Sequence, residues 1–212
     1  MTGDTHAAVG AAIGVSVAGF ASSDICSVTT TAGVIIAGCV GGLLPDSDLP
    51  GTKGRKYLAG GVFALALLLG TMKNSRLSTS VSSFLMHSFP VLVWVIIYLA
   101  IVLRSHSHRG FTHSLTSLAI TAICLGLLPA GSNVFVIAFL LGMLSHIVID
   151  LFNTKGEQLF WPLKPRFCFN LCTSSGYVNA VIRTVACVIL ILECTVFGGS
   201  EVLKIVRSVF NL

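Results

Sequence analysis

The stretch His106–Ser114 reads HSHRGFTHS and lies between two apolar runs, at residues 88–103 and 114–129. It holds three of the chain's six histidines, namely His106, His108 and His113. A dense group of histidines at the border of a hydrophobic segment indicates metal or proton chemistry rather than packing. We therefore expect the polar side chains of the neighbouring segments to converge on this stretch.

The composition predicts a membrane protein. The 212-residue chain is 54% hydrophobic and 10% charged, with a mean hydropathy of +0.92, whereas a soluble domain carries roughly 25% charged residues. We expect an all-α, polytopic helical bundle in residues 1–177, followed by an apolar helix and short tail in residues 178–212, with the lipid bilayer as partner. The scattered charges of the +5 chain argue against a nucleic-acid footprint.

Hydropathy predicts seven apolar segments, at residues 6–21, 31–44, 57–72, 88–103, 114–129, 133–152 and 178–198. Whether the first, second and last of these cross a membrane completely stays open, because the first two are short and the last carries charges. When the segments alternate across a membrane, one face receives His6, Asp46, Asp48, the His106–Ser114 stretch, His146 and Asp150. Most basic residues of the loops lie on that face too, so the positive-inside rule predicts a multi-pass protein whose polar face is cytoplasmic.

Two pairs of residues on this face have metal-binding spacing. His146 and Asp150 are four residues apart, so a helix places both on one side, where they can hold one ion. His108 and His113 are separated by a turn containing Gly110, which can fold around an ion. His146 and Asp150 also have a plainer reading, as a buried hydrogen-bonded pair in a bundle. His87 and His106 are expected to lie at the membrane interface or to support the ligands rather than to bind an ion.

Asp46 and Asp48 add two carboxylates directly after Pro45, although Asp-Ser-Asp is also an ordinary turn sequence. Imidazole and carboxylate together suit zinc, manganese or iron, and such an ion would lower the pKa of a bound water. The candidate metal ligands are His6, Asp46, Asp48, His108, His113, His146 and Asp150. Their joint position on one predicted face favours a metal site over the separate plainer readings.

The candidate catalytic residues are Arg109 and Asp48. Arg109 either stabilises developing negative charge on a phosphate oxygen or anchors its loop at the lipid head groups. Ser114 is expected to cap the fifth helix rather than to act as a nucleophile.

These motifs resemble those of the YdjM-like inner-membrane proteins, a family of predicted metal-dependent hydrolases. The resemblance covers most of the chain and is carried by His6, LPDSD at Leu44–Asp48, HRGFTHS at His108–Ser114, GMLSH at Gly142–His146, and Asp150. The family usually continues its Pro-Asp-x-Asp motif with histidine, and this chain has Leu49 there, which leaves the number of bound ions open.

The resemblance implies an inner (plasma) membrane protein that binds one to three divalent ions, zinc foremost. Because the family is distantly similar to zinc-dependent phospholipase C, it also implies hydrolysis of a phosphoester, including a lipid-linked one, by a metal-activated water. Two alternatives stay open: a divalent metal or proton transporter, and a non-catalytic membrane protein with a structural metal site. The substrate, the metal and the oligomeric state are not predicted.

Overall fold

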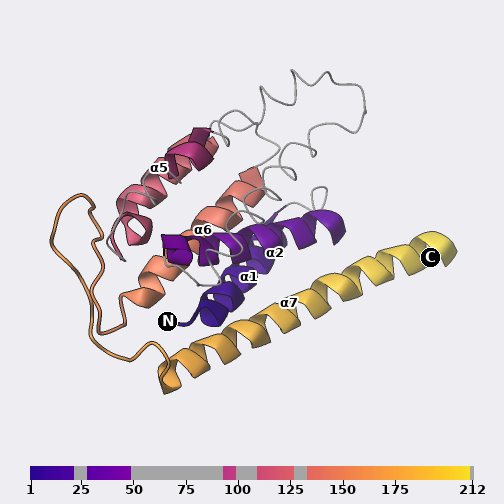
Figure 1. Cartoon of the computed structure of the whole chain (residues 1–212). Helices are drawn as coiled ribbons and strands as arrows, with labels where there is room; N and C mark the ends of the chain where they lie inside the picture. Colours follow the sequence, from indigo (N-terminus) through magenta and orange to yellow (C-terminus); the bar gives the residue numbers. More distant parts are fainter. Residues whose placement is uncertain (22–27, 49–92, 99–108, 127–132, 211–212) are drawn as a thin grey trace.

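The computed structural model describes residues 1–21, 28–48, 93–98, 109–126 and 133–210 (Figure 1). Its helices are α1 (Gly3–Phe20), α2 (Val28–Leu43), α5 (Leu115–Gly126), α6 (Asn133–Asp150) and α7 (Tyr177–Phe210), with two 3-10 turns, η1 (Leu44–Asp48) and η2 (Phe111–His113). Residues 93–98 are helical as well. No β-strand occurs in these ranges, so the predicted all-α fold class is confirmed.

Five of the seven predicted apolar segments correspond to α1, α2, α5, α6 and α7. The segment at 57–72 lies outside the described residues, and only 93–98 of the segment at 88–103 is described. The last helix is longer than predicted, because it continues to Phe210 without a break. The division of the chain at residue 177 stays a prediction.

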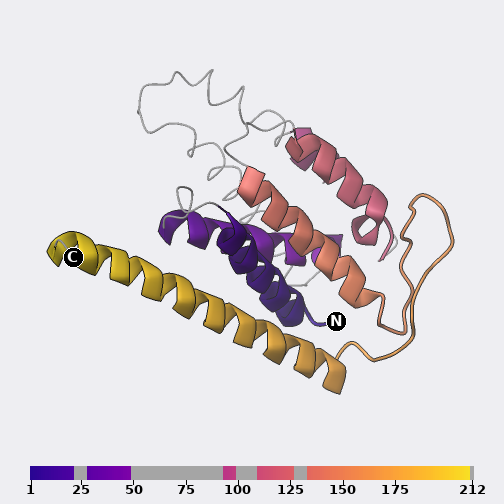
Figure 2. The same cartoon turned by 180° about the vertical axis from the view of Figure 1, so that it is seen from behind.

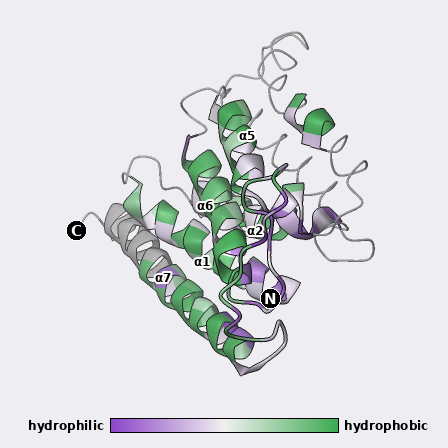
Figure 3. Ribbon diagram, turned by 90° about the vertical axis from the view of Figure 1, so that its left-hand side faces the viewer, coloured by the Kyte–Doolittle hydropathy of each residue, from purple (hydrophilic) through white to green (hydrophobic). Residues whose placement is uncertain are grey.

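Three described helices are long and apolar enough to cross a membrane: Thr29–Asp48, Asn133–Asp150 and Tyr177–Val196. The window in α7 is only 11% buried within the molecule, so its apolar side chains are available to lipid. Figure 3 shows hydrophobic residues along α6 and α7. The protein is therefore a helical membrane protein.

Glycines let α1, α2 and α6 approach one another at backbone distance. A Cβ atom added to Gly38 of α2 would lie 2.2 Å from the carbonyl oxygen of Gly10 in α1. One added to Gly142 of α6 would lie 2.2 Å from the carbonyl oxygen of Gly38. Any side chain at these positions would force the helices apart, as is usual where small residues line a membrane helix interface.

This packing brings the start of α1, the end of α6, the start of α7 and the turns η1 and η2 close together. Figures 1 and 2 show the start of α1 near the end of α6 and the start of α7, with α5 on the other side of α6. The turns η1 and η2 contact each other, and η1 also contacts α6. A core that includes Trp94, Phe111, Phe135 and Phe139 supports these turns and α6 from within.

Candidate metal centre

Five predicted ligands converge where these ends meet: His6 from α1, Asp46 from η1, His113 from η2, and His146 and Asp150 from α6. The three histidines are fully buried, although imidazole is a polar group that is normally hydrogen-bonded when buried. His108 lies outside the described residues. Asp48 is in no group of converging ligand atoms among the described residues, but it contacts the site through Thr112.

His146 is held by the backbone of the glycine-rich helix α2. Its Nδ1 lies 2.7 Å from the carbonyl oxygen of Gly42. Because a carbonyl only accepts, Nδ1 carries the proton in the neutral ring, and Nε2 keeps its lone pair. Such a bond from the far nitrogen to a carbonyl is the usual partner arrangement of a metal-binding histidine.

His113 is held in the same way by Thr112. The Thr112 hydroxyl donates to Asp48 Oδ2 at 3.0 Å, and its oxygen lies 3.0 Å from His113 Nδ1. With the hydroxyl proton engaged by Asp48, the oxygen accepts from Nδ1 of His113. The Nε2 atom of His113 is then also left with a lone pair.

The two Nε2 atoms of His113 and His146 face each other 3.2 Å apart. Asp46 Oδ1 lies 3.6 Å from the first and 3.7 Å from the second. Two lone pairs and a carboxylate repel unless a cation lies among them. Ligand atoms of a tetrahedral zinc ion are about 3.3 Å apart, so these three atoms fit one divalent ion, which would satisfy all of them at once.

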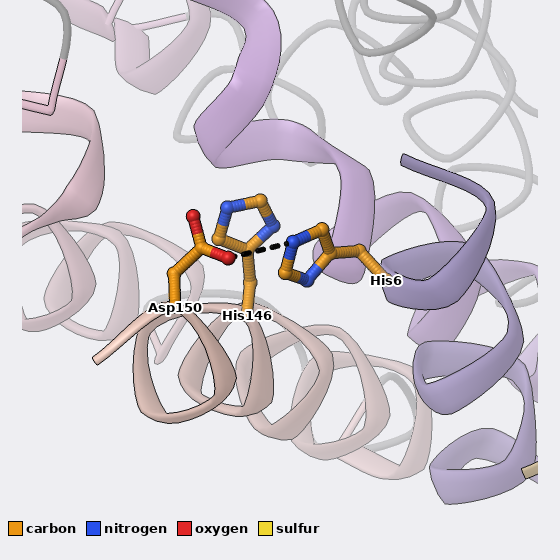
Figure 4. Close-up of side chains that lie close together, drawn as sticks. All are labelled: His6, His146 and Asp150. Atoms are coloured by element: carbon orange, nitrogen blue, oxygen red, sulfur yellow. Dashed lines mark ion pairs between the residues drawn. The ribbon is translucent and has the colours of Figure 1, made fainter. Parts of the chain in front are cut away.

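His6 and Asp150 form a second donor set with His146 (Figure 4). The His6 ring stacks on that of His146, with centroids 3.6 Å apart, and its Nε2 lies 3.1 Å from Asp150 Oδ1. Within the described part of the chain, neither ring nitrogen of His6 makes a hydrogen bond of normal geometry. Burying an imidazole nitrogen without a hydrogen bond is costly, and a bound ion would supply the missing partner.

Asp150 accepts hydrogen bonds on both of its carboxyl oxygens. Its Oδ1 accepts a hydrogen bond from Asn153 at 2.8 Å and one from the Met1 amino group. Its Oδ2 accepts from Arg109 at 3.1 Å. Because Asp150 is held from three sides, its position is fixed before any ion binds.

Arg109 reaches Asp150 from an unusual backbone conformation, with φ at 62°. A second guanidinium nitrogen donates to the carbonyl of Lys155, and the backbone carbonyl of Arg109 accepts from Gln158 at 3.2 Å. The side chain is buried. The strained loop thus places a cation against the candidate metal centre rather than at the protein surface, which fits the predicted anchor at lipid head groups less well than the predicted role at a phosphate oxygen.

Glu157, which the sequence indicates only weakly as an additional acid, lies within the site. It is fully buried and forms a third donor set with His113 and Asp150. Neither of its carboxyl oxygens has a hydrogen-bond partner among the described residues. Burial, followed by the nearby charge of Asp150, raises the pKa of Glu157 to about 9. Such a group is a proton-bearing acid at neutral pH until a cation replaces the proton.

The sequence carries only a weak signal for the supporting residues. Glu157 and Asn153 lie in an irregular segment after α6, where no period predicts which side chains turn inward. Glu157 exchanges two backbone hydrogen bonds of 2.9 Å with Phe167, and this bridge turns the carboxyl toward the site. The predicted cap is confirmed, because the Ser117 backbone N–H donates to Ser114 Oγ at 3.0 Å at the start of α5.

Comparison with known proteins identifies a family for this chain. The model of the family described as YdjM inner membrane protein matches residues 1–206. The proteins named Inner membrane protein YdjM from Escherichia coli (strain K12) and from Shigella flexneri are each 39% identical to the chain over 70 residues.

That matched stretch is 31% of this chain and 36% of the length of each relative. No solved structure matches the chain. Since the family model spans nearly all of the sequence, this chain belongs to the YdjM family of inner membrane proteins.

Proposed function

We propose that this protein is a membrane-bound, metal-dependent hydrolase that cleaves a phosphoester with a metal-activated water. The supporting observation is the pair of Nε2 atoms of His113 and His146, which face each other at 3.2 Å with Asp46 beside them. The family description names a location and no reaction, so the proposed activity depends on this donor set.

Asp46, His113 and His146 would hold the first divalent ion, and zinc suits their mixture of imidazole and carboxylate. His6, Asp150 and Glu157 would hold one or two further ions, because their donor sets share His146 and His113 with the first and Asp150 with each other. When bound, such ions lower the pKa of a neighbouring water and stabilise negative charge on a phosphoryl oxygen.

Two further residues, Asp48 and Arg109, would assist the reaction without holding an ion. Asp48 fixes the Thr112 hydroxyl and through it the ring of His113. Arg109 uses two nitrogens on Asp150 and the Lys155 carbonyl, while its Nε has no hydrogen-bond partner among the described residues. That remaining N–H is available to a substrate oxygen, where a cationic donor stabilises the charge that develops.

The environment of the site suits an anionic substrate at a membrane surface. The Asp46 side chain is 16% exposed whereas the His113 and His146 side chains are 0% exposed, so water reaches the centre from the η1 side. The segment that follows α6 exposes Lys155, Lys164 and Arg166, which attract phosphate head groups. By the positive-inside rule this face is cytoplasmic in a multi-pass arrangement.

A structural ion is the alternative that the burial of the histidines favours. A structural metal site is closed, whereas a catalytic site keeps one position open to water or substrate. The two readings differ for Asp46→Asn, which changes the most exposed ligand. A structural ion predicts loss of folding stability, whereas the hydrolase predicts a folded protein with reduced turnover.

The first test is elemental analysis of detergent-purified protein after reloading with zinc or manganese. We expect a stoichiometric ion in the wild type and in the control Arg183→Gln, an exposed position outside the donor sets, and none in a folded His113→Ala/Asp150→Ala double variant. The loaded wild type should then hydrolyse a phosphoester, with turnover lost in the double variant. A wild type that takes up no divalent ion would rule out the proposal.

A further inference from the structure

Next to the candidate metal centre, α1, α6 and α7 line an apolar groove. Its volume is about 350 Å³, which lies within the range of roughly 300–1,000 Å³ for ligand pockets. The walls include Val9, Ala12 and Ser16 of α1, Ile149 of α6, and Val185 and Ala186 of α7. Apart from the Ser16 hydroxyl, no lining side chain offers a hydrogen bond, so the groove suits a hydrocarbon.

A hydrogen bond between α1 and α7 lies at each end of the groove. Near the start of both helices, Thr5 donates to Asn179 Oδ1 at 2.9 Å. At the other end, Ser16 donates to Glu193 Oε1, also at 2.9 Å. These contacts fix the separation of α1 and α7, which run side by side in the same direction (Figures 1 and 2). Between them the small side chains of Ala12 and Ala186 leave space that larger residues would fill.

One end of the groove lies beside the metal centre. Ile149 directly precedes Asp150, and Val9 is close to one helical turn after His6. The other flank faces outward, because Val185 is 52% exposed on a helix that is apolar enough to cross a membrane. A hydrocarbon chain could therefore enter from the bilayer without crossing water.

The shape and polarity of the groove indicate which kind of molecule can occupy it. A helix of a partner protein is about 10 Å across, too wide for a space of this volume between two packed helices. An extended peptide would bury backbone polar groups that the aliphatic walls cannot satisfy. A single lipid tail has neither difficulty, because its CH₂ groups contact aliphatic side chains in the groove much as they contact other tails in the bilayer.

We propose that this groove holds the hydrocarbon tail of a membrane lipid whose phosphoester head group lies at the metal centre. The position of the head group rests on the proposed hydrolase function, whereas the position of the tail depends only on the groove. The substrate class is therefore a long-chain phospholipid rather than a soluble phosphoester.

The tail is tested by photo-crosslinking of the full chain in lipid nanodiscs, with a phosphatidic acid that carries a diazirine in mid-chain. We expect adducts, mapped by mass spectrometry, to concentrate on residues 9–16 and 181–189. Ala186→Trp fills the groove and should reduce these adducts several-fold, and Ala186→Leu should reduce them less. Val188→Trp is the matched control, since Val188 is 48% exposed on the same helix and does not line the groove.

Measurements of turnover distinguish a failure of the tail site from a failure of the proposed hydrolase function. With both correct, Ala186→Trp lowers hydrolysis of the long-chain phosphatidic acid but leaves that of the soluble p-nitrophenyl phosphate unchanged. Groove adducts that Ala186→Trp abolishes, without hydrolysis of either compound, would support the tail site and overturn the hydrolase. Adducts spread evenly over the outer face of α7, equal labelling of the two Trp variants, or cross-linked dimers in place of lipid adducts would overturn the tail site whatever the turnover.

Discussion

At the scale of single residues, the fold changes the charge state of Glu157, which lies outside the apolar helices. Its carboxyl is buried without a hydrogen-bond partner among the described residues, and its pKa is raised from 4.5 to about 9. Between these two values the folded, metal-free protein retains a proton that the unfolded chain releases. Stability of the metal-free protein therefore falls as the pH rises through this window.

Glu157→Gln should remove that part of the pH dependence, because the amide resembles the protonated acid and does not ionise. We expect the metal-free variant to lose less thermal stability than metal-free wild type between pH 6 and pH 9, and to bind a divalent ion more weakly. Melting temperatures of chelator-treated protein measure the first effect, and metal content after reloading the second. Parallel pH profiles for the two proteins would contradict the assignment of a buried, protonated Glu157.

Thr112 is predicted to act on metal binding through His113. Thr112→Val removes the hydroxyl that connects Asp48 to His113 Nδ1, so the ring loses the partner that fixes its orientation. Loss of such a partner lowers metal affinity by about 10- to 100-fold. Competition with a fluorescent zinc chelator measures the change.

The matched control is Thr116→Val, which removes a hydroxyl bonded to the Trp161 carbonyl at 2.7 Å and leaves the histidines untouched. Thr112→Ser retains the hydroxyl and should restore most of the affinity. If Thr112→Val and Thr116→Val weaken zinc binding equally, the orienting role is wrong.

The residues of the site differ in how far sequence patterns could locate them. His6, Asp46, His113, His146 and Asp150 all lie at ends of apolar helices or directly beyond them, so alternation across a membrane was enough to bring them to one face. His146 and Asp150 also share a helical period. Glu157 and Asn153 turn inward only because of long-range backbone bonds such as that between Glu157 and Phe167, which no local pattern encodes.

At the scale of elements, the close packing of α2 and α6 makes Gly142 a sensitive position. Gly142→Ala would place a methyl group 2.2 Å from the Gly38 carbonyl oxygen, and relieving such overpacking costs about 1–3 kcal/mol. The helices would separate next to the bond between Gly42 and His146, so metal content should also fall. Unfolding in mixed detergent and SDS measures the stability.

Gly126→Ala is the control for that substitution, because a Cβ atom there has nothing within 4 Å. Alanine favours a helix over glycine by about 1 kcal/mol, so this variant should be as stable as the wild type or slightly more stable. If Gly142→Ala and Gly126→Ala unfold at the same proportion of SDS, the contact between α2 and α6 tolerates a side chain.

The sequence predicts which helices exist better than it predicts where they begin and end. Hydropathy located α1, α2, α5 and α6 to within a few residues, because each is an unbroken apolar run. It ended the last segment at residue 198, whereas α7 continues to Phe210, since the backbone hydrogen bonds of a helix do not require an apolar sequence. The parallel alignment of α1 and α7 depends on Thr5–Asn179 and Ser16–Glu193 pairs that lie more than 170 residues apart, beyond any sequence period.

At the scale of the whole molecule, the orientation in the membrane decides which solution reaches the metal centre. The segment between α6 and α7 connects two helices that are long enough to cross a bilayer, and it begins beside Asp150. It exposes Lys155, Lys164 and Arg166, and basic residues in short loops are retained on the cytoplasmic side. The proposed substrate would then be reached from the inner leaflet.

Lys164→Cys, in a chain whose native cysteines are replaced by serine or alanine, tests that orientation. Lys164 is exposed and lies in an irregular segment, so a thiol there should react with a membrane-impermeant maleimide whenever the reagent reaches its side of the membrane. We expect labelling in inverted membrane vesicles and in permeabilised cells, and none in intact spheroplasts. Equal labelling of spheroplasts would place the metal centre on the outer side, so that any lipid substrate would have to come from the outer leaflet.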